Sequence, residues 1–135
     1  MRWNQLLQCL TLPSLLAVIT LSFGSVASAA STYKVLYSFK GGSDGGGVFA
    51  GIAFDTKGNL YGTTTGGGAY GEGTAFELKA GSGGKWSETI LHSFCAQSRC
   101  TDGASPQSTP VFDASGNLYG TTNGTSFELS PSQRG

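Results

Sequence analysis

Beyond about residue 30, the chain alternates between short apolar runs and stretches rich in glycine and polar residues. The first runs are GIAFD (51–55), NLYGTT (59–64), GTAFELK (73–79) and WSETILHSF (86–94). The segment Thr56-Lys57-Gly58 between the first two is typical of a tight hairpin turn in which glycine adopts a positive φ. No stretch of ten or more residues in this region has the helical spacing of apolar positions. The pattern therefore predicts an all-β fold of short antiparallel strands.

The apolar runs recur along the chain. FDTKGNLYGTT (54–64) returns as FDASGNLYGTT (112–122), with nine of eleven positions identical. Two shorter pairs follow the same order: VLYSF (35–39) with ILHSF (90–94), and FEL (76–78) with FEL (127–129). A unit of four short strands in about 50–58 residues is typical of one blade of a β-propeller. We therefore divide residues 30–135 into two β-propeller-like units, about 33–85 and 86–135.

The strand count predicts an incomplete ring. YKVLYSF (33–39) corresponds to the fourth strand of a unit; one complete unit follows, and three strands of the next end the chain. Because propellers usually have four to eight blades, two units imply either a longer parent propeller or self-association of several copies. Ile90 and Phe94 are expected on one face of their strand and Leu91 on the other. Eight side chains are expected to be mostly buried: Phe54, Leu60, Phe76, Leu78, Phe112, Leu118, Phe127 and Leu129.

Residues 1–29 are interpreted as a secretory signal peptide. A weakly basic start precedes an apolar stretch at about residues 6–23, and small residues then allow cleavage near Ala29 or Ala30. The alternative is a membrane anchor, because a spanning helix needs about 20 apolar residues. The proline within the stretch and its Ala/Ser-rich tail favour cleavage. We expect a secreted or extracytoplasmic protein of one domain (30–135) that meets the membrane only through its signal peptide.

Composition and charge narrow the classes of function. Without Arg2, seven Lys/Arg face eight Asp/Glu and form no basic stripe, which argues against nucleic-acid binding. Cys95 and Cys100 in CAQSRC are most simply interpreted as a disulfide that closes a small loop in an exported protein. A metal site would need more ligands than the nearby His92, and the spacing is not the C-x-x-C of redox motifs. We therefore expect neither a metal nor a cofactor.

The two copies of the repeated phrase carry equivalent carboxylates. Asp55 is followed by Gly58 and Asn59, and Asp113 by Gly116 and Asn117. In the structural interpretation, each aspartate accepts backbone hydrogen bonds and stabilises the turn that follows it. A calcium ligand or an acid–base pair is the alternative, but calcium loops usually gather several Asp/Asn oxygens within a dozen residues. We interpret both turns as structural.

Other polar candidates are interpreted in the same way. His92 aligns with a tyrosine in the other unit, which suggests packing of a flat ring rather than catalysis. Glu77 and Glu128 hold equivalent strand positions and belong to the repeated pattern. GGGAYG (66–71) matches G-x-G-x-x-G, but a strand follows it, where a dinucleotide fold requires a helix. Tyr70 at the tip of this loop is the loop aromatic we expect to contact a ligand, and no catalytic residue is predicted.

The pattern YSF…G…D..GNLYGTT..GG..G.GT.FEL resembles the GloVer (choice-of-anchor) tandem repeat of exported bacterial proteins. The resemblance covers nearly all of residues 30–135, and its most specific part is the GNLYGTT core with the Gly-Gly loop. It implies an extracytoplasmic, propeller-like repeat protein with no established activity.

We expect a non-enzymatic structural or binding module whose ligand is a carbohydrate or a protein. The alternatives are a fragment of a propeller hydrolase or lyase, and a truncated remnant without independent activity. An enzyme would gather carboxylates, or His92 with partners, in one pocket, whereas a binding module would expose aromatic side chains at one rim.

Overall fold

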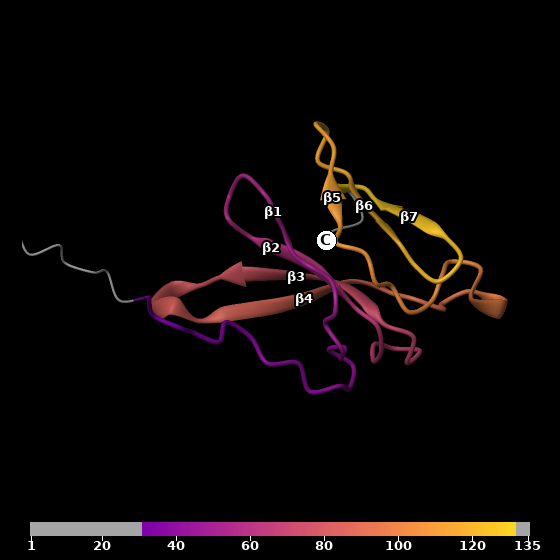
Figure 1. Cartoon of the computed structure of the whole chain (residues 1–135), viewed down its shortest axis with the longest axis horizontal. Coiled ribbons are helices and arrows are strands. Elements are labelled where there is room, and N and C mark those ends of the chain that lie inside the picture. Colours follow the sequence, from indigo (N-terminus) through magenta and orange to yellow (C-terminus); the bar gives the residue numbers. More distant parts are fainter. Residues whose placement is uncertain (1–30, 132–135) are drawn as a thin grey trace, which may run out of the picture. The chain divides into compact units, whose positions relative to one another are not determined.

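Two antiparallel β-sheets form the regular structure of residues 31–131, the part of the chain that the computed structural model describes. The first sheet has the strand order β1-β2-β3-β4 and the second β5-β6-β7 (Figure 1). The strands are β1 (Ala53–Phe54), β2 (Leu60–Thr64), β3 (Thr74–Ala80), β4 (Trp86–Ser93), β5 (Val111–Phe112), β6 (Leu118–Thr121) and β7 (Ser126–Leu129). Two 3-10 turns, η1 (Ser82–Gly84) and η2 (Ser98–Cys100), complete the regular elements of this range. The predicted all-β fold is confirmed; the predicted signal peptide lies outside the described residues.

The two copies of the repeated phrase adopt the same pairing. In the first sheet, Tyr61 lies opposite Glu77 and Gly62 opposite Phe76. In the second, the corresponding pairs are Tyr119 with Glu128 and Gly120 with Phe127. Each glycine lies beneath the ring of its cross-strand phenylalanine, so identical sequence positions produce the same local packing twice.

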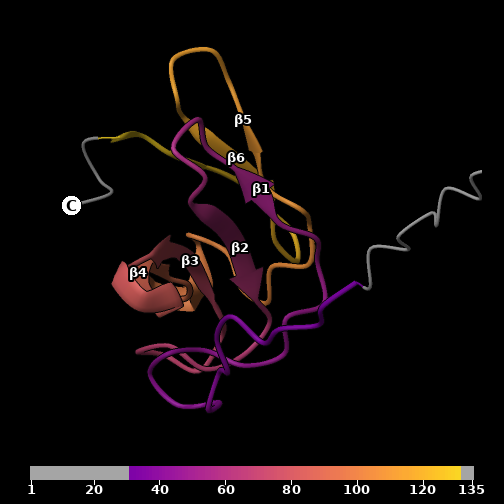
Figure 2. The same cartoon turned by 90° about the vertical axis from the view of Figure 1, so that its left-hand side faces the viewer.

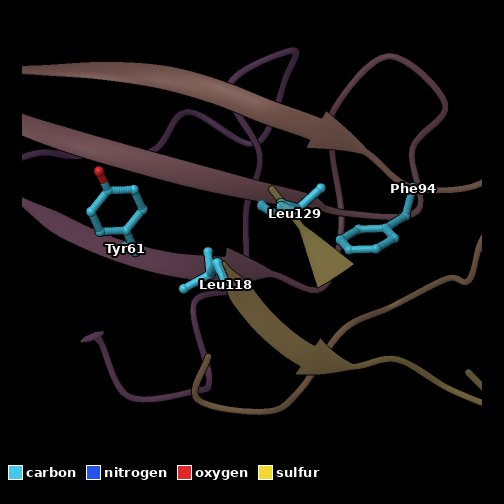
Figure 3. Packing of buried hydrophobic residues seen from close by; sticks show 5 residues of the cluster. Tyr61, Phe94, Leu118 and Leu129 are labelled. Carbon is cyan, nitrogen blue, oxygen red and sulfur yellow. The ribbon is translucent and has the colours of Figure 1, made fainter. Parts of the chain in front are cut away.

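One hydrophobic cluster lies between the two sheets. Tyr61 and Ala75 come from the first sheet, Leu118 and Leu129 from the second, and Phe94 from the segment directly after β4 (Figure 3). Phe94 and Leu118 are completely buried. Because alternate residues of a strand point to opposite faces, the LYGTT and FEL runs can contribute to a core on each face of the first sheet.

A second cluster covers the other face of the first sheet. Its buried members are Leu60, Phe76 and Leu78, and the N-terminal segment packs on it through Tyr37 and Phe39. The ring centroids of Phe39 and Phe76 are 4.7 Å apart. The first sheet is therefore covered on both faces, which explains why all five residues of β2 are buried.

Two predictions about individual segments are wrong. Residues 33–39 run without forming a strand, although YKVLYSF has the composition of one, and they pair with neither described sheet. Phe54 was expected in the core but is 64% exposed, since β1 is an edge strand of only two residues. Phe112 and Phe127 are half-buried, and the other five members of the expected core are buried.

A β-bulge changes the faces predicted for β4. Ala75 pairs with His92, whereas the next residue, Phe76, pairs with Ile90. Leu91 is thus the extra residue, and one extra residue reverses the side to which the following side chains point. Ile90 consequently packs with the second cluster, whereas Phe94 lies in the cluster between the sheets. The prediction that Ile90 and Phe94 share one face is therefore wrong.

A pair of threonines closes the base of each β-hairpin loop. Thr64 Oγ1 and Thr74 Oγ1 are 2.9 Å apart, and Thr122 Oγ1 and Thr125 Oγ1 are 2.7 Å apart. In the first sheet, the indigo and violet segment around residues 41–47 runs beside the loop that follows β2 (Figure 2). Gly45 lies there against the threonine hydroxyls, with no space for a side chain.

Candidate functional site: a cleft between two equivalent turns

The turn after β1 is organised by one carboxylate. Asp55 Oδ1 accepts hydrogen bonds from the backbone N–H groups of Lys57 (2.8 Å) and Asn59 (2.9 Å), and Oδ2 accepts one from Asn59 Nδ2 (2.8 Å). The backbone of Gly58 has φ 83°, which residues with a Cβ rarely adopt. The Asp-x-x-Gly-Asn spacing therefore fits the geometry of this turn.

The turn after β5 repeats this arrangement. Asp113 Oδ1 accepts hydrogen bonds from the N–H groups of Ser115 (2.9 Å) and Asn117 (2.8 Å), and Oδ2 accepts one from Asn117 Nδ2 (2.8 Å). Gly116 also has φ 83°. Both aspartates thus bind the turn that follows them in the same way.

Tyrosine hydroxyls extend both networks into the sheets. Tyr61 Oη lies 3.3 Å from Asp55 Oδ2 and donates a short hydrogen bond of 2.6 Å to Glu77 Oε1. Glu77 is buried and pairs through Oε2 with Lys79 Nζ at 3.1 Å. In the second copy, Tyr119 Oη lies 3.2 Å from Asp113 Oδ2. Only the first copy buries its glutamate: Glu77 is buried beside Tyr61, which packs in the cluster between the sheets, whereas Glu128 is exposed.

These hydrogen bonds lower the pKa of both aspartates. Partial burial acts to raise the pKa of Asp55, but hydrogen bonds from Asn59, Lys57 and Tyr61 outweigh it and lower the pKa below its usual value of 3.8. The pKa of Asp113 is lowered in the same way, chiefly by the side chain and backbone of Asn117. Two carboxylates therefore carry negative charge at neutral pH.

A cleft of about 520 Å³ lies between the two turns. Asp55 and Lys57 line one side, Asp113 and Ser115 the other, and Tyr61 and Glu77 also reach it. The volume falls in the range of about 300–1,000 Å³ that is usual for ligand sites. Because the turns are equivalent, the cleft presents similar polar groups from two directions.

Two phenylalanines add apolar surface to the cleft. Phe54 precedes Asp55 and Phe112 precedes Asp113, and both line the cleft. The Phe112 ring meets Tyr61 edge-on at a centroid distance of 4.9 Å, which fixes its orientation. Phe54 is 64% exposed, so its ring remains available to a ligand. The repeated Phe-Asp pair in the sequence was the signal that could have identified this site.

The cleft combines aromatic rings, ionised carboxylates and the ammonium groups of Lys57 and Lys79. Such a set can stack against an apolar face and accept or donate hydrogen bonds around it. No group of three or more His, Cys, Asp or Glu side chains in the described region is arranged to hold a metal ion.

A second network connects β4 to the loop after it. His92 Nε2 lies 3.1 Å from Asp102 Oδ2, and Asp102 also accepts hydrogen bonds from the N–H groups of Ala96 and Gln97. The His92 ring packs edge-on against Phe94 at 4.9 Å. Burial acts to raise the pKa of Asp102, but the backbone hydrogen bonds and His92 lower it. His92 therefore has a packing partner and a carboxylate partner, and neither belongs to the cleft.

The remaining sequence candidates lie outside the cleft. Cys95 and Cys100 form the expected disulfide, which indicates an oxidising, extracytoplasmic environment. Tyr70 is half exposed at the tip of its loop and does not line the cleft.

Among residues 31–131, no helix is both long and apolar enough to cross a membrane.

The chain matches no protein-family model, and no curated protein is significantly similar to it.

Proposed function

We propose that this protein is an exported, non-enzymatic binding module that holds a carbohydrate in the cleft between its two equivalent turns. The observation that carries the proposal is the pairing of Phe54 and Phe112 with Asp55 and Asp113 around one cavity. A sugar ring has an apolar C–H face and a rim of hydroxyl groups. Aromatic rings suit the first and ionised carboxylates suit the second.

The electrostatics of the cleft support binding over hydrolysis. A glycoside hydrolase needs one carboxylic acid whose pKa is raised so that it can protonate the leaving group. The carboxyls of the two turns have lowered pKa values instead, because their oxygens accept several hydrogen bonds. The hydrolase or lyase alternative would require Glu77 to act as the acid, although its oxygens are already engaged by Tyr61 and Lys79.

The propeller-like architecture belongs to the same proposal. The two sheets pack face to face through a common cluster, and corresponding residues pair in the same register. Sheets packed against one another in this manner are the building principle of blades. The resemblance to GloVer-type repeats stays a prediction, and it agrees with a binding surface built from turns that occur once in each unit.

Binding can be tested with a panel of soluble oligosaccharides and isothermal titration calorimetry on residues 30–135. Phe54→Ala and Phe112→Ala should each reduce the affinity for the best ligand by about tenfold or more, since one aromatic contact contributes about 1–3 kcal/mol to binding. The matched control is Phe49→Ala, because Phe49 is 81% exposed and does not line the cleft. Equal loss in Phe49→Ala, or no binding to any member of the panel, contradicts the proposal. Release of reducing sugar that disappears in Glu77→Gln would favour the hydrolase alternative.

A further inference from the structure

β7 is an edge strand with an open groove beside it. In the described part of the chain, β7 pairs only with β6. A groove of about 520 Å³ runs along the strand and is lined by every residue from Thr125 to Leu129. Leu91, His92 and Asp102 form the opposite wall. An unpaired strand edge of this kind can accept another strand by backbone hydrogen bonding.

In the first sheet, the corresponding place is filled by β4. The residues equivalent to His92 and Asp102 are Tyr37 and Asp44, which form the same kind of contact, with Tyr37 Oη 3.4 Å from Asp44 Oδ2. Glu88 of β4 acts on the same pair: burial, then the charges of Glu88 and Asp44, raise the pKa of Tyr37. The groove beside β7 in the second sheet therefore corresponds to the place that β4 occupies in the first sheet.

The chain carries a second copy of that fourth strand. YKVLYSF (33–39) corresponds to the β4 sequence and lacks a strand partner among the described residues. Tyr33 is 90% exposed, Val35 55% and Leu36 38%, so the segment presents neighbouring apolar side chains that another chain could cover.

Residues 33–39 already lie against the first sheet as the fourth strand of a preceding sheet would lie. Phe39 packs on Phe76 at 4.7 Å, and its counterpart Phe94 packs on Phe127 at 5.1 Å. The segment thus holds the same position against the first sheet that the end of β4 holds against the second.

We propose that the groove beside β7 binds residues Tyr33–Phe39 of a second copy of this chain, which add to the second sheet as its fourth strand. The contact joins the C-terminal sheet of one copy to the N-terminal segment of the next. Because the two surfaces differ, the association is head-to-tail and generates a ring if its rotation closes. With two sheets in each copy, a ring of about six or eight blades contains three or four copies.

The register follows from the pairing of β3 with β4. Phe76 pairs with Ile90 and Glu77 with Thr89 in the first sheet. The same register places Phe127 opposite the second copy's Val35 and Glu128 opposite its Lys34. Opposite charges directly across an antiparallel pair stabilise it by about 0.2–1 kcal/mol. Within residues 31–131 of a single copy, Lys34 Nζ donates to the exposed carbonyl of Gly84, a contact that is easily exchanged.

The first test disrupts the incoming strand. Val35→Pro removes a backbone donor and resists strand addition, whereas Val35→Thr keeps a β-branched residue and serves as the matched control. Val35 is exposed and makes no hydrogen bond to other described residues, so both variants should fold, which circular dichroism checks. Light scattering should show a discrete assembly for the native chain and Val35→Thr, and monomers for Val35→Pro. A monomeric native chain, or an assembly that survives Val35→Pro, overturns the proposal.

The second test measures the register in trans. Chains carrying Lys34→Cys are mixed with chains carrying Glu128→Cys, and oxidised dimers are quantified on non-reducing gels. Lys34→Cys mixed with Lys57→Cys is the control, because Lys57 lies in the turn after β1. Dimers should form at least tenfold faster in the first mixture. Equal rates overturn the proposed register.

Assembly and ligand binding are read out separately. Val35→Pro should retain saccharide binding, because Val35 does not line the cleft. Phe54→Ala should retain assembly, because Phe54 does not line the groove beside β7. Failure of either proposal therefore leaves the other intact.

Discussion

Gly62 offers the sharpest test of how the first sheet is packed. A Cβ at this position would lie 2.5 Å from Cζ and 3.0 Å from Cε1 of Phe76, whereas carbon atoms in contact prefer about 3.5–4.0 Å. Phe76 is 1% exposed and is covered by Phe39, so its ring has nowhere to move. Gly62→Ala should therefore strain the core.

Two opposing terms set the size of the effect. Replacing glycine by alanine in a strand is normally favourable by about 0.5–1 kcal/mol, because the unfolded chain loses freedom. Forcing an extra carbon into a close-packed core costs about 1–3 kcal/mol. The net loss for Gly62→Ala should be about 1–2 kcal/mol, which for a domain of this size lowers Tm by about 5–15 °C.

Thermal unfolding followed by circular dichroism measures the change, and Gly120→Ala is the matched control. Phe127 stands over Gly120 in the same way, but it is half-buried and borders the open groove, so its ring can yield. In dilute monomer, Gly120→Ala should be close to neutral. Phe76→Leu should remove most of the penalty of Gly62→Ala in a double-mutant cycle. A Gly62→Ala variant as stable as the native chain would refute the packing argument.

Three further predictions concern stability. Cys95→Ser with Cys100→Ser should lower the free energy of unfolding by about 2 kcal/mol in urea titrations, the value that loop-closure entropy gives for so short a loop. Asp55 has a lowered pKa in the folded state, so its contribution to stability is complete above the ordinary value of 3.8 and is lost as pH falls through the lower folded pKa. The urea concentration at the unfolding midpoint should therefore decrease as the pH falls below about 4. The decrease should be smaller in Asp55→Asn. Glu88 shows the opposite sign, because burial, then Asp44, raise its pKa in the folded state. Its contribution to stability is complete below the ordinary value of 4.5 and is lost as pH rises through the higher folded pKa. Its Oε1 is buried without a hydrogen-bond partner among the described residues. Glu88→Gln removes the disfavoured charge near Asp44 and should therefore raise the urea midpoint at pH 7.

Local sequence signals accounted for β1 to β7 and for the two turns, but not for the absence of a strand at residues 33–39. The alternation in GTAFELK and the Asp-x-x-Gly-Asn spacing both depend on contacts within a few residues, and β3 and the two turns lie where these patterns predict. The disulfide follows from proximity along the chain in the same way. These features need no knowledge of how the sheets pack.

Features that depend on distant neighbours could not be predicted in this way. The bulge at Leu91 arises from the fit of β4 on β3 and reverses the face of Phe94. Phe54 is exposed because β1 is a short edge strand, although its residue type predicts burial. The cleft was missed for the same reason, because it exists only where two turns 58 residues apart in the sequence face one another.

The threonine pairs have a practical consequence for protein engineering. Nine residues separate Thr64 from Thr74, but only two separate Thr122 from Thr125, and both pairs close with nearly the same oxygen–oxygen distance. The hydrogen bond between the two threonine hydroxyls therefore forms with a long loop as well as with a short one. Foreign peptides of varied length should be accepted at residues 123–124 without disturbing β6 and β7, so the scaffold is suited to displaying grafted epitopes.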